Sequence, residues 1–262
     1  MISFNHLGNH GHLGNQMFQY AAIKGIATKY GRDFMIPPKE IFGKYYYTKL
    51  RSSINDCFDL DCARGMSDYP TIQENGFSFD KNLFENFPEQ NVNLLGFFQS
   101  DKWFTHIKED IKKDFIFIPE YNDPASDARQ SFNGKIGSIH IRRTDYVNNL
   151  SHNCQTNEYF EKSLNQIPED CEVLIFSDDP EWCKSQPIFS SDRFLISETD
   201  NAYIDLALIT MCNYIIIGSS SFSWWGAYLS NAEVVIAPNT WFGPNNSHLD
   251  TTDIYCDGWI IL

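Results

Sequence analysis

Two adjacent arginines, Arg142 and Arg143, follow an apolar run and are the residues of this chain best suited to chemistry. The run before them, residues 135–141, alternates small and apolar side chains in the manner of a buried strand. In an open α/β sheet, ligands bind at the carboxyl ends of strands, where these guanidinium groups would lie. Their planar donor groups match a diphosphate, and Asp145 can pair with one of them. The pattern indicates an anion site, with an internal arginine–aspartate ion pair as the alternative.

Two further polar clusters follow predicted strands in the same half of the chain. Asp178 and Asp179 come after residues 171–177, and a serine run, residues 219–221, comes after residues 214–217. Because the carboxyl ends of parallel strands meet at one edge of a sheet, the three clusters should lie along that edge. Serines before a helix offer amides and hydroxyls to a phosphate, with a plain serine N-cap as the alternative.

Strands and helices alternate regularly from residue 136 onward, which predicts a doubly wound parallel sheet. The preceding stretch, residues 119–133, is polar and contains Pro124, which indicates a linker. We therefore expect two domains, residues 1–133 and 134–262. The expected strands of the second are residues 136–141, 171–177, 193–196, 214–217 and 233–237, with helices near 157–167 and 200–212.

A glycine-rich loop, residues 6–16, lies between a short predicted strand and a helix expected from residue 17 to about residue 30. Free amides at a helix N-terminus bind anions, and Asn15 is a good N-cap residue. One alternative is a plain strand–turn–helix. Another is a metal site, which we do not expect because no carboxylate stands near its three histidines, His6, His10 and His12.

Asp205 interrupts an otherwise apolar helical segment, residues 204–209. A buried carboxylate needs hydrogen-bond donors. Guanine presents N1–H and N2–H side by side, which suits a carboxylate. Asp205 is therefore a candidate for binding a guanine base, with a solvent-facing or salt-bridged aspartate as the alternative.

Several of these stretches resemble the α-1,2-fucosyltransferases, glycosyltransferase family 11. His-x-Arg-Arg-x-Asp-Tyr, residues 140–146, is similar to the family's nucleotide-sugar motif, which α-1,6- and protein O-fucosyltransferases share in looser form. Gly-Asn-Gln-Met-Phe-Gln-Tyr-Ala, residues 14–21, resembles its N-terminal signature. Ser-Ser-Phe-Ser-Trp-Trp-Gly, residues 220–226, resembles a third stretch. The resemblance runs in the family's order from about residue 8 to residue 225.

The resemblance implies the α/β architecture called GT-B, in which two Rossmann-like lobes with parallel sheets face a cleft. The C-terminal lobe would bind GDP-fucose, and the N-terminal lobe would shape the acceptor side. The implied reaction is an inverting, metal-independent transfer of fucose from GDP-β-L-fucose to O2 of a terminal galactose of a glycan. No metal or other cofactor is then expected, because arginines can neutralise the leaving diphosphate.

The resemblance also implies roles for individual residues. Arg142 would stabilise the charge that grows on the β-phosphate, and the candidates for the base are Asp145, His140 and Asn15. The family usually has glycines directly before Leu-Gly-Asn, whereas this chain has Gly11 and His12 there in a longer loop. The donor site would be formed by Gly14, Asn15, His140, Arg142, Arg143, Asp178, Asp179, Asp205, Ser219, Ser220, Ser221 and Phe222.

Two other classes of function stay open at this stage. One is a metal-dependent glycosyltransferase of other specificity, using either Asp59 and Asp61 or the pair Asp178 and Asp179. Its activity would be sensitive to a chelator. The other is a non-catalytic protein that binds a sugar nucleotide or a glycan and turns over nothing.

The composition of the chain argues against some classes of binding partner and indicates a reducing compartment. The formal net charge of −14 argues against nucleic acid and against an anionic membrane surface. No apolar run approaches the roughly 20 residues of a membrane helix, and we see no signal peptide. Seven cysteines without a Cys-x-x-Cys pair indicate reduced thiols. We expect a cytoplasmic enzyme, with peripheral attachment to a membrane that carries the acceptor as an alternative.

Overall fold

The computed structural model describes residues 1–41 and 52–262, which form two compact units. Unit 1 comprises Met1–Ile118 and Leu249–Tyr255. Unit 2 comprises Pro119–His248 and Cys256–Leu262. The sequence pattern places the domain boundary after residue 133, whereas unit 1 ends at residue 118 and unit 2 begins at residue 119. A short segment near the C-terminus, Leu249–Tyr255, also belongs to unit 1.

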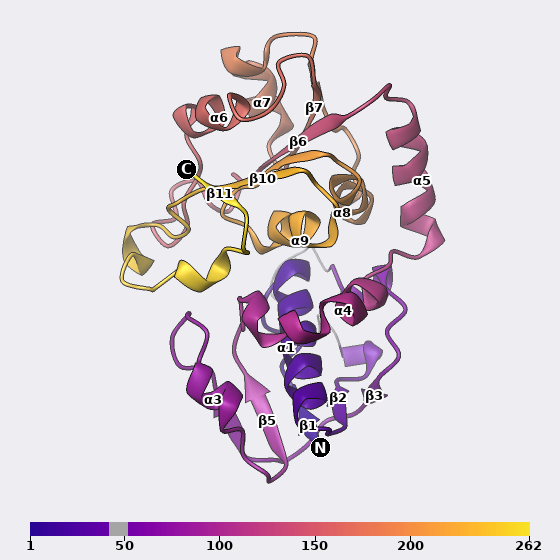
Figure 1. Ribbon diagram of the computed structural model, residues 1–262, viewed down its shortest axis with the longest axis vertical. Helices are drawn as coiled ribbons and strands as arrows, with labels where there is room; N and C mark the ends of the chain where they lie inside the picture. The colour runs from indigo at the N-terminus through magenta and orange to yellow at the C-terminus, as the bar shows by residue number, and fades with distance from the viewer. Residues whose placement is uncertain (42–51) are drawn as a thin grey trace. The chain divides into compact units, whose positions relative to one another are not determined.

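Unit 1 is built on a five-stranded parallel sheet with the order β3-β2-β1-β5-β4. Its strands are β1 Ile2–Ser3, β2 Phe34–Ile36, β3 Ala63–Arg64, β4 Thr71–Gln73 and β5 Val92–Leu95 (Figure 1). Its helices are α1 Leu13–Lys29, α2 Ile54–Cys57, α3 Lys81–Glu85 and α4 Lys108–Asp114. Short 3₁₀ turns lie at Lys39–Ile41, Asp101–Trp103, Thr105–Ile107 and Thr252–Ile254.

Helix α1 is buried on almost all sides, in keeping with its apolar composition. Gly25 allows close packing, because a Cβ there would lie 2.2 Å from the carbonyl oxygen of Trp103. The chain turns at Gly11, whose φ of +98° favours glycine, and the helix begins at Leu13 with His12 as its N-cap. The prediction that Asn15 caps this helix is therefore wrong, since Asn15 lies within its first turn.

Unit 2 contains a six-stranded parallel sheet with the order β11-β10-β9-β6-β7-β8. Figure 1 shows α6 and α7 on one face of this sheet and α9 on the other. The alternation of strands and helices predicted from residue 136 is confirmed, and β11 is an addition. The strands are β6 Ile136–Ile141, β7 Glu172–Ser177, β8 Phe194–Ile196, β9 Tyr214–Ile216, β10 Val234–Ala237 and β11 Ile260–Ile261. The helices are α5 Pro119–Gln130, α6 Asn157–Leu164, α7 Pro180–Ser185, α8 Ala202–Thr210 and α9 Ser221–Leu229, with 3₁₀ turns at Pro187–Phe189 and Pro244–Asn246.

Helix α5 occupies the stretch that the sequence pattern assigned to a linker. It packs on α8, where the ring centroids of Tyr121 and Tyr203 lie 4.8 Å apart. The side chain of Arg129 also donates a hydrogen bond to the carbonyl of Met211 at 3.3 Å. Only one residue of α5, Ala125, is buried. The polar composition belongs to the exposed surface of a helix, so the prediction of a linker is wrong.

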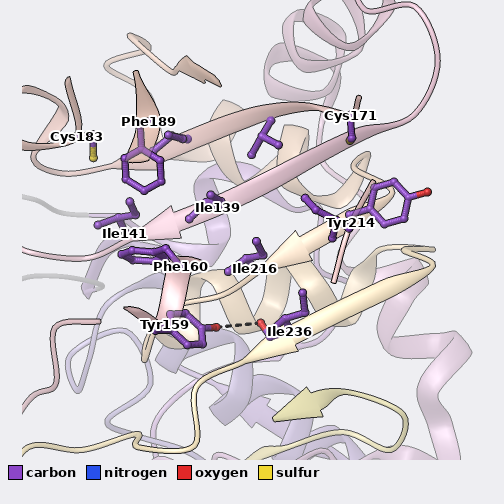
Figure 2. Close-up of a cluster of buried hydrophobic side chains, with 13 residues drawn as sticks. Ile139, Ile141, Tyr159, Phe160, Cys171, Cys183, Phe189, Tyr214, Ile216 and Ile236 are labelled. Atoms are coloured by element: carbon purple, nitrogen blue, oxygen red, sulfur yellow. Dashed lines mark hydrogen bonds between the residues drawn. The ribbon is translucent and has the colours of Figure 1, made fainter. Parts of the chain in front are cut away.

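The core of unit 2 is a cluster of apolar side chains from the sheet and α6 (Figure 2). All six residues of the central strand β6 are buried. The hydroxyl of Tyr159 donates to the carbonyl of Ile217 at 2.7 Å and lies 3.3 Å from that of Ile236, which ties α6 to β9 and β10. The register pairs Ile141 with Ser177. The residues that follow β6 and β7 therefore emerge next to each other at the carboxyl edge of the sheet.

Candidate functional site

The arginine loop, residues 142–146, is held by Asp178 from the neighbouring strand. One carboxylate oxygen of Asp178 accepts the backbone N–H of Arg143 at 2.8 Å. The other accepts the backbone N–H of Thr144 at 3.2 Å, bonds the Thr144 hydroxyl and lies 3.2 Å from Nε of Arg142. A carboxylate with these partners fixes both the backbone and a side chain of the loop.

Arg142 is paired with two carboxylates. Its Nε and Nη2 each lie 2.8 Å from Oδ1 of Asp145, and its Nε also faces Asp178. Burial opposes the charge of Arg142, but these carboxylates outweigh that penalty and raise its pKa. Among the described residues, Nη1 of Arg142 has no hydrogen-bond acceptor. The guanidinium is therefore charged and oriented, with donor capacity remaining for an anion.

Arg143 is held differently, between a carboxylate and an aromatic ring. Its Nε lies 3.1 Å from Oδ2 of Asp179, and its Cζ lies 3.9 Å from the ring centroid of Trp182. Asp179 is also the N-cap of α7, because its Oδ1 accepts the N–H of Trp182 at 3.2 Å. Sequence reasoning missed Trp182 as a site residue. A sequence signal was present: Asp-Pro at residues 179–180 is typical of a helix start, and Trp182 stands three residues after that aspartate.

The serine run is integrated into the fold of unit 2. The hydroxyl of Ser219 donates to the carbonyl of Thr240 at 3.0 Å and accepts from the side chain of Gln155 at 2.6 Å. Ser220 is the N-cap of α9, and its hydroxyl accepts the N–H of Phe222 at 3.3 Å. Ser221 is the first residue of that helix. The N-cap alternative thus describes Ser220, while the amides of the helix N-terminus remain at the same edge of the sheet.

The arginine loop also contacts the serine run directly. The hydroxyl of Tyr146 donates to the carbonyl of Ser219 at 3.1 Å. The ring of Tyr146 stacks on His152, with centroids 4.2 Å apart and an interplanar angle of 10°. These contacts join the segments that follow β6 and β9. The convergence of the three polar clusters is therefore visible in the contacts of Asp178, Asp179 and Ser219 with one loop.

His140 is a buried polar residue at the end of β6. Its Nδ1 has no hydrogen-bond partner among the described residues, and its ring centroid lies 5.2 Å from that of Phe222. Burial, followed by the charge of Arg142, lowers the pKa of His140 to about 3. The imidazole is thus neutral at physiological pH. A buried polar atom without a partner is costly, which makes Nδ1 a candidate contact for a ligand.

Asp205 lies in the first turn of α8, close to the end of β8. Its Oδ1 accepts the hydroxyl of Ser197 at 2.9 Å and that of Thr199 at 2.6 Å. Burial raises the pKa of Asp205, and these two hydrogen bonds oppose the rise. Its Oδ2 has no donor among the described residues. Sequence reasoning missed the two hydroxyl residues, which stand as Ser-x-Thr directly after β8.

A shallow cavity of about 300 Å³ lies beside Arg143 within unit 2. One wall is formed by residues 147–152, which follow the arginine loop. The backbone N–H groups of Gly243 and Asn245 donate hydrogen bonds to the carbonyls of Ser151 and Leu150 and hold this segment against residues 242–246. Gly243 is required there, because a Cβ would lie 2.5 Å from the carbonyl oxygens of Leu150 and His152. The cavity is lined by Arg143, Tyr146, Val147, Asn148, Asn149, Leu150, His152, Cys154 and Pro244.

Gly14 and Asn15 belong to unit 1, in the first turn of α1. Oδ1 of Asn15 accepts a hydrogen bond from the side chain of Gln99 at 2.6 Å. A Cβ at Gly11 would lie 2.4 Å from Cβ of Asn15, so the glycine-rich loop packs tightly on this residue. These two candidates are thus fixed within unit 1, separately from the cluster of unit 2.

The alternative metal sites have other surroundings. Asp59 and Asp61 are exposed on either side of the buried Leu60. His10 stacks on Phe97, with ring centroids 4.4 Å apart. In residues 1–41 and 52–262, no group of three or more His, Cys, Asp or Glu side chains is arranged to hold a metal ion. No helix in the described part of the chain has the length and apolar character needed to cross a membrane.

Comparison with known families identifies the chain. The sequence profile described as glycosyl transferase family 11 matches residues 2–262. The chain belongs to glycosyl transferase family 11. This membership makes it a glycosyltransferase of the fucosyltransferase family, and the resemblance inferred from several stretches between residues 8 and 225 is confirmed.

Relatives of this family 11 protein differ in the sugar that their names give. It is 31% identical over 284 residues to an alpha-1,2-colitosyltransferase of Escherichia coli, which covers 95% of this chain and 96% of the relative. It is 25% identical over 252 residues to galactoside 2-alpha-L-fucosyltransferase SEC1 of Bos taurus, which covers 87% of this chain and 65% of the relative.

A solved structure shows the same fold. The NodZ alpha-1,6-fucosyltransferase, from a crystal soaked with GDP-fucose, matches with a TM-score of 0.54 and 13% identity, over 87% of this chain and 92% of that chain. The family 11 protein therefore has two parallel-sheet units of the GT-B type, and the predicted fold class is confirmed.

Proposed function

We propose that this glycosyltransferase moves fucose from GDP-β-L-fucose to O2 of a terminal galactose of a glycan, with inversion and without a metal ion. The observation that carries the proposal is the arginine loop. Two guanidinium groups stand at the carboxyl edge of a parallel sheet, and three carboxylates fix them in place. A preorganised pair of this kind suits a leaving diphosphate.

The chemical step is a single displacement. An acceptor hydroxyl oxygen forms a bond to the anomeric carbon as the bond between that carbon and the β-phosphate oxygen breaks. The electron pair of the broken bond goes to the diphosphate, where charge grows in an oxocarbenium-like transition state. Arg142 stabilises that charge, with Arg143 and the amides at the start of α9 in support. Preorganised stabilisation of this type contributes several kcal/mol.

Guanine recognition follows from two groups of unit 2. The N1–H and N2–H of guanine donate to the carboxylate of Asp205, whose Ser197 and Thr199 partners hold it in place. The neutral ring of His140 offers Nδ1 as a further hydrogen-bonding atom. His140 is the penultimate residue of β6, and Asp205 is bonded to Ser197 and Thr199, which follow β8. Their exchange for apolar residues would leave the base edge unpaired.

The three candidates for the general base differ in their proton affinity. His140 has a pKa of about 3, and Asn15 is an amide that is not a base in this range. Burial opposes the ionisation of Asp145, but its bond to Arg142 prevails and lowers its pKa. None has the near-neutral pKa that favours general base catalysis. We assign the rate enhancement chiefly to stabilisation of the leaving group, with the acceptor proton passing to water.

The environment of Asp178 and Asp179 supports a mechanism without metal. Both carboxylates are bonded to the arginine loop, so a cation would have to displace arginines to bind them. The arginines also supply the positive charge that a metal would supply. Activity in a chelator is expected, and full loss of activity in EDTA with recovery on Mg²⁺ or Mn²⁺ would support the metal-dependent alternative.

A second donor, GDP-colitose, is favoured by the relationship to the alpha-1,2-colitosyltransferase. Colitose is fucose without its 3-hydroxyl group. A site that hydrogen-bonds this hydroxyl rejects the sugar lacking it by roughly 10⁴-fold or more, whereas an apolar site rejects the added hydroxyl by only about 10². The ratio of kcat/KM for the two donors therefore decides between them.

The test is release of GDP by the purified protein in EDTA, with lactose present or absent. Lactose-dependent release from GDP-fucose, with a new α-1,2 linkage in the product, supports the proposal. Release from GDP-colitose alone assigns the second donor. GDP binding without turnover of either donor on any galactoside supports a non-catalytic protein, and absence of GDP binding overturns the donor assignment.

A further inference from the structure

Glu74 makes an unusual contact at the carboxyl edge of the unit 1 sheet. It follows β4, and its own N–H donates to the carbonyl of Leu95 at the end of β5. Its carboxylate accepts two consecutive backbone N–H groups, that of Phe97 at 2.7 Å and that of Phe98 at 2.9 Å. One side chain thus fixes the turn by which the chain leaves β5, defined here as residues 96–99.

This turn has a backbone that needs such support. Phe98 has a φ of +54°, which a non-glycine residue seldom adopts, and its side chain is fully buried against Phe4 and Trp103. Gly96 has a φ of +159°, and a Cβ there would lie 2.4 Å from Cβ of Glu74. Backbone strain persists only where its surroundings determine the conformation, and Glu74 provides two of the determining contacts.

The same turn holds the glycine-rich loop. Gln99, at its end, donates to Oδ1 of Asn15 at 2.6 Å. The side chain of Gln19 lies within hydrogen-bonding distance of the carbonyls of His10 and Gly96, at 2.8 and 3.0 Å. The ring of His10 stacks on Phe97. A shift of the turn therefore moves Asn15 and the loop before α1 together.

We propose that Glu74 is a positioning residue for transfer, which acts through the turn 96–99 to hold Asn15 and the glycine-rich loop in the geometry that receives the acceptor. The inference rests on the proposed function, in which this part of unit 1 serves the acceptor sugar. Glu74 itself touches no substrate in this scheme. Its carboxylate is needed in the ionised form, because Oε2 and Oε1 accept one N–H group each and the oxygen that carries a proton is the poorer acceptor.

Protonation of Glu74 falls within the physiological range. Burial raises its pKa to about 7, although the N–H groups of Phe98 and Phe97 oppose the rise. Among the described residues, no charged side chain on β5 or α1 shifts this pKa. His10, on the glycine-rich loop, has its pKa lowered by burial and by His6, so it is neutral where Glu74 titrates. The kcat/KM for the acceptor should therefore rise with pH as Glu74 ionises.

The first test is Glu74→Gln, with Glu85→Gln as the matched control. Glu85 is a glutamate of unit 1 on α3, paired with Lys29 outside this network. We expect Glu74→Gln to raise KM for lactose at least about tenfold and to leave the Kd for GDP within about twofold, since a hydrogen bond to a charged group is lost. The wild type should lose kcat/KM for lactose below about pH 7, and the variant should not show this limb.

The second test asks whether Glu74 acts through Gln99. Gln99→Leu removes the bond to Asn15 and leaves Glu74 in place. If Glu74 acts through Gln99, the KM for lactose of the double variant Glu74→Gln/Gln99→Leu should equal that of the more severe single variant. If the two residues act independently, their effects on KM should multiply, because their free-energy costs add. Additive effects, or an unchanged acceptor KM and pH profile in Glu74→Gln, overturn the inference. Absence of transfer by the wild type overturns the proposed function instead, which keeps the two failures distinct.

Discussion

The guanidinium carbon of Arg143 lies 3.9 Å from the ring centroid of Trp182. The two residues come from different strand ends, and Asp179 joins them by bonding both the Arg143 side chain and the Trp182 N–H. The indole ring thus helps to hold the guanidinium group of Arg143 in one position. A cation–π contact of this kind contributes about 0.5 to 2 kcal/mol.

Replacing Trp182 should therefore weaken donor binding. In Trp182→Leu, we expect the Kd for GDP to rise about three- to tenfold, because Arg143 loses the ring that holds its plane. Trp182→Phe keeps an aromatic face and should restore most of the affinity. Calorimetric titration with GDP measures both variants, and equal loss in both would contradict a role for the ring.

Arg142→Lys should abolish most of the activity. A lysine carries a point charge and cannot bond Asp145 and a phosphate through one planar group. We expect kcat to fall about 10²- to 10³-fold. Arg193→Lys is the control, because Arg193 is an arginine of unit 2 that bonds the carbonyl of Glu169. Near-normal turnover in Arg142→Lys would remove Arg142 from the mechanism.

Asp178→Asn tests the arrangement of the arginine loop. The amide group of asparagine would face one of the backbone N–H groups of Arg143 and Thr144, and the pairing with Arg142 would weaken. We expect the Kd for GDP to rise at least about tenfold. Asp170→Asn, an exposed position before β7, should leave the Kd unchanged. If both variants bind GDP as the wild type does, the loop is held by other contacts.

Gly218→Ala should disturb the surroundings of His140, on the side of the site where we propose that guanine binds. A Cβ at Gly218 would lie 3.0 Å from the carbonyl oxygen of His140, and 3.9 Å from its Nδ1. Because the nearest neighbour is backbone, relief requires movement of β6 or β9 rather than a rotamer change. We expect a lower Tm and weaker GDP binding. Gly65→Ala meets only the flexible Sδ of Met35 at 3.1 Å and is the control for both measurements.

The stability of the protein should depend on His140 in acid. Its pKa is about 3 in the folded chain, against 6.5 for an unperturbed histidine, so between these values the unfolded state binds more protons. Stability is therefore lost as pH falls below 6.5. From pH 7.5 to pH 5, the penalty is about 2 kcal/mol. Urea unfolding of His140→Asn should show an acid-induced loss smaller by that amount, and an identical loss would contradict a buried neutral ring.

Local sequence pattern was sufficient for five of the six strands in the sheet of unit 2. Apart from Ser138 and His140, residues 136–141 are apolar or glycine because β6 is buried on both faces, and the arginines mark its end because charges cannot remain in that core. The same reasoning placed Asp178 and Ser219 at the same edge. Once strands alternate with helices, a parallel sheet brings their carboxyl ends together.

Pattern was insufficient where a distant partner decides the conformation. Residues 119–133 are polar, and only contact with α8 shows that they include a helix. Asn15 is a good N-cap by type, but the chain turns at Gly11 and the N-cap is His12, three residues earlier. The two-residue strand β11 exists through pairing with β10, and its own sequence is too short to carry a signal.

The sequence by itself determined the family, the arginine loop and the strand ends that carry the candidate site. These features depend on residue type and on contacts between neighbours along the chain. The tertiary structure decided what each charged group does. The strand register brings Asp178 to the backbone of Arg143, and a turn 22 residues beyond Glu74 places two amides on its carboxylate. The physical reason is that burial and hydrogen-bond partners set the behaviour of a charge, and both come from residues far away in sequence.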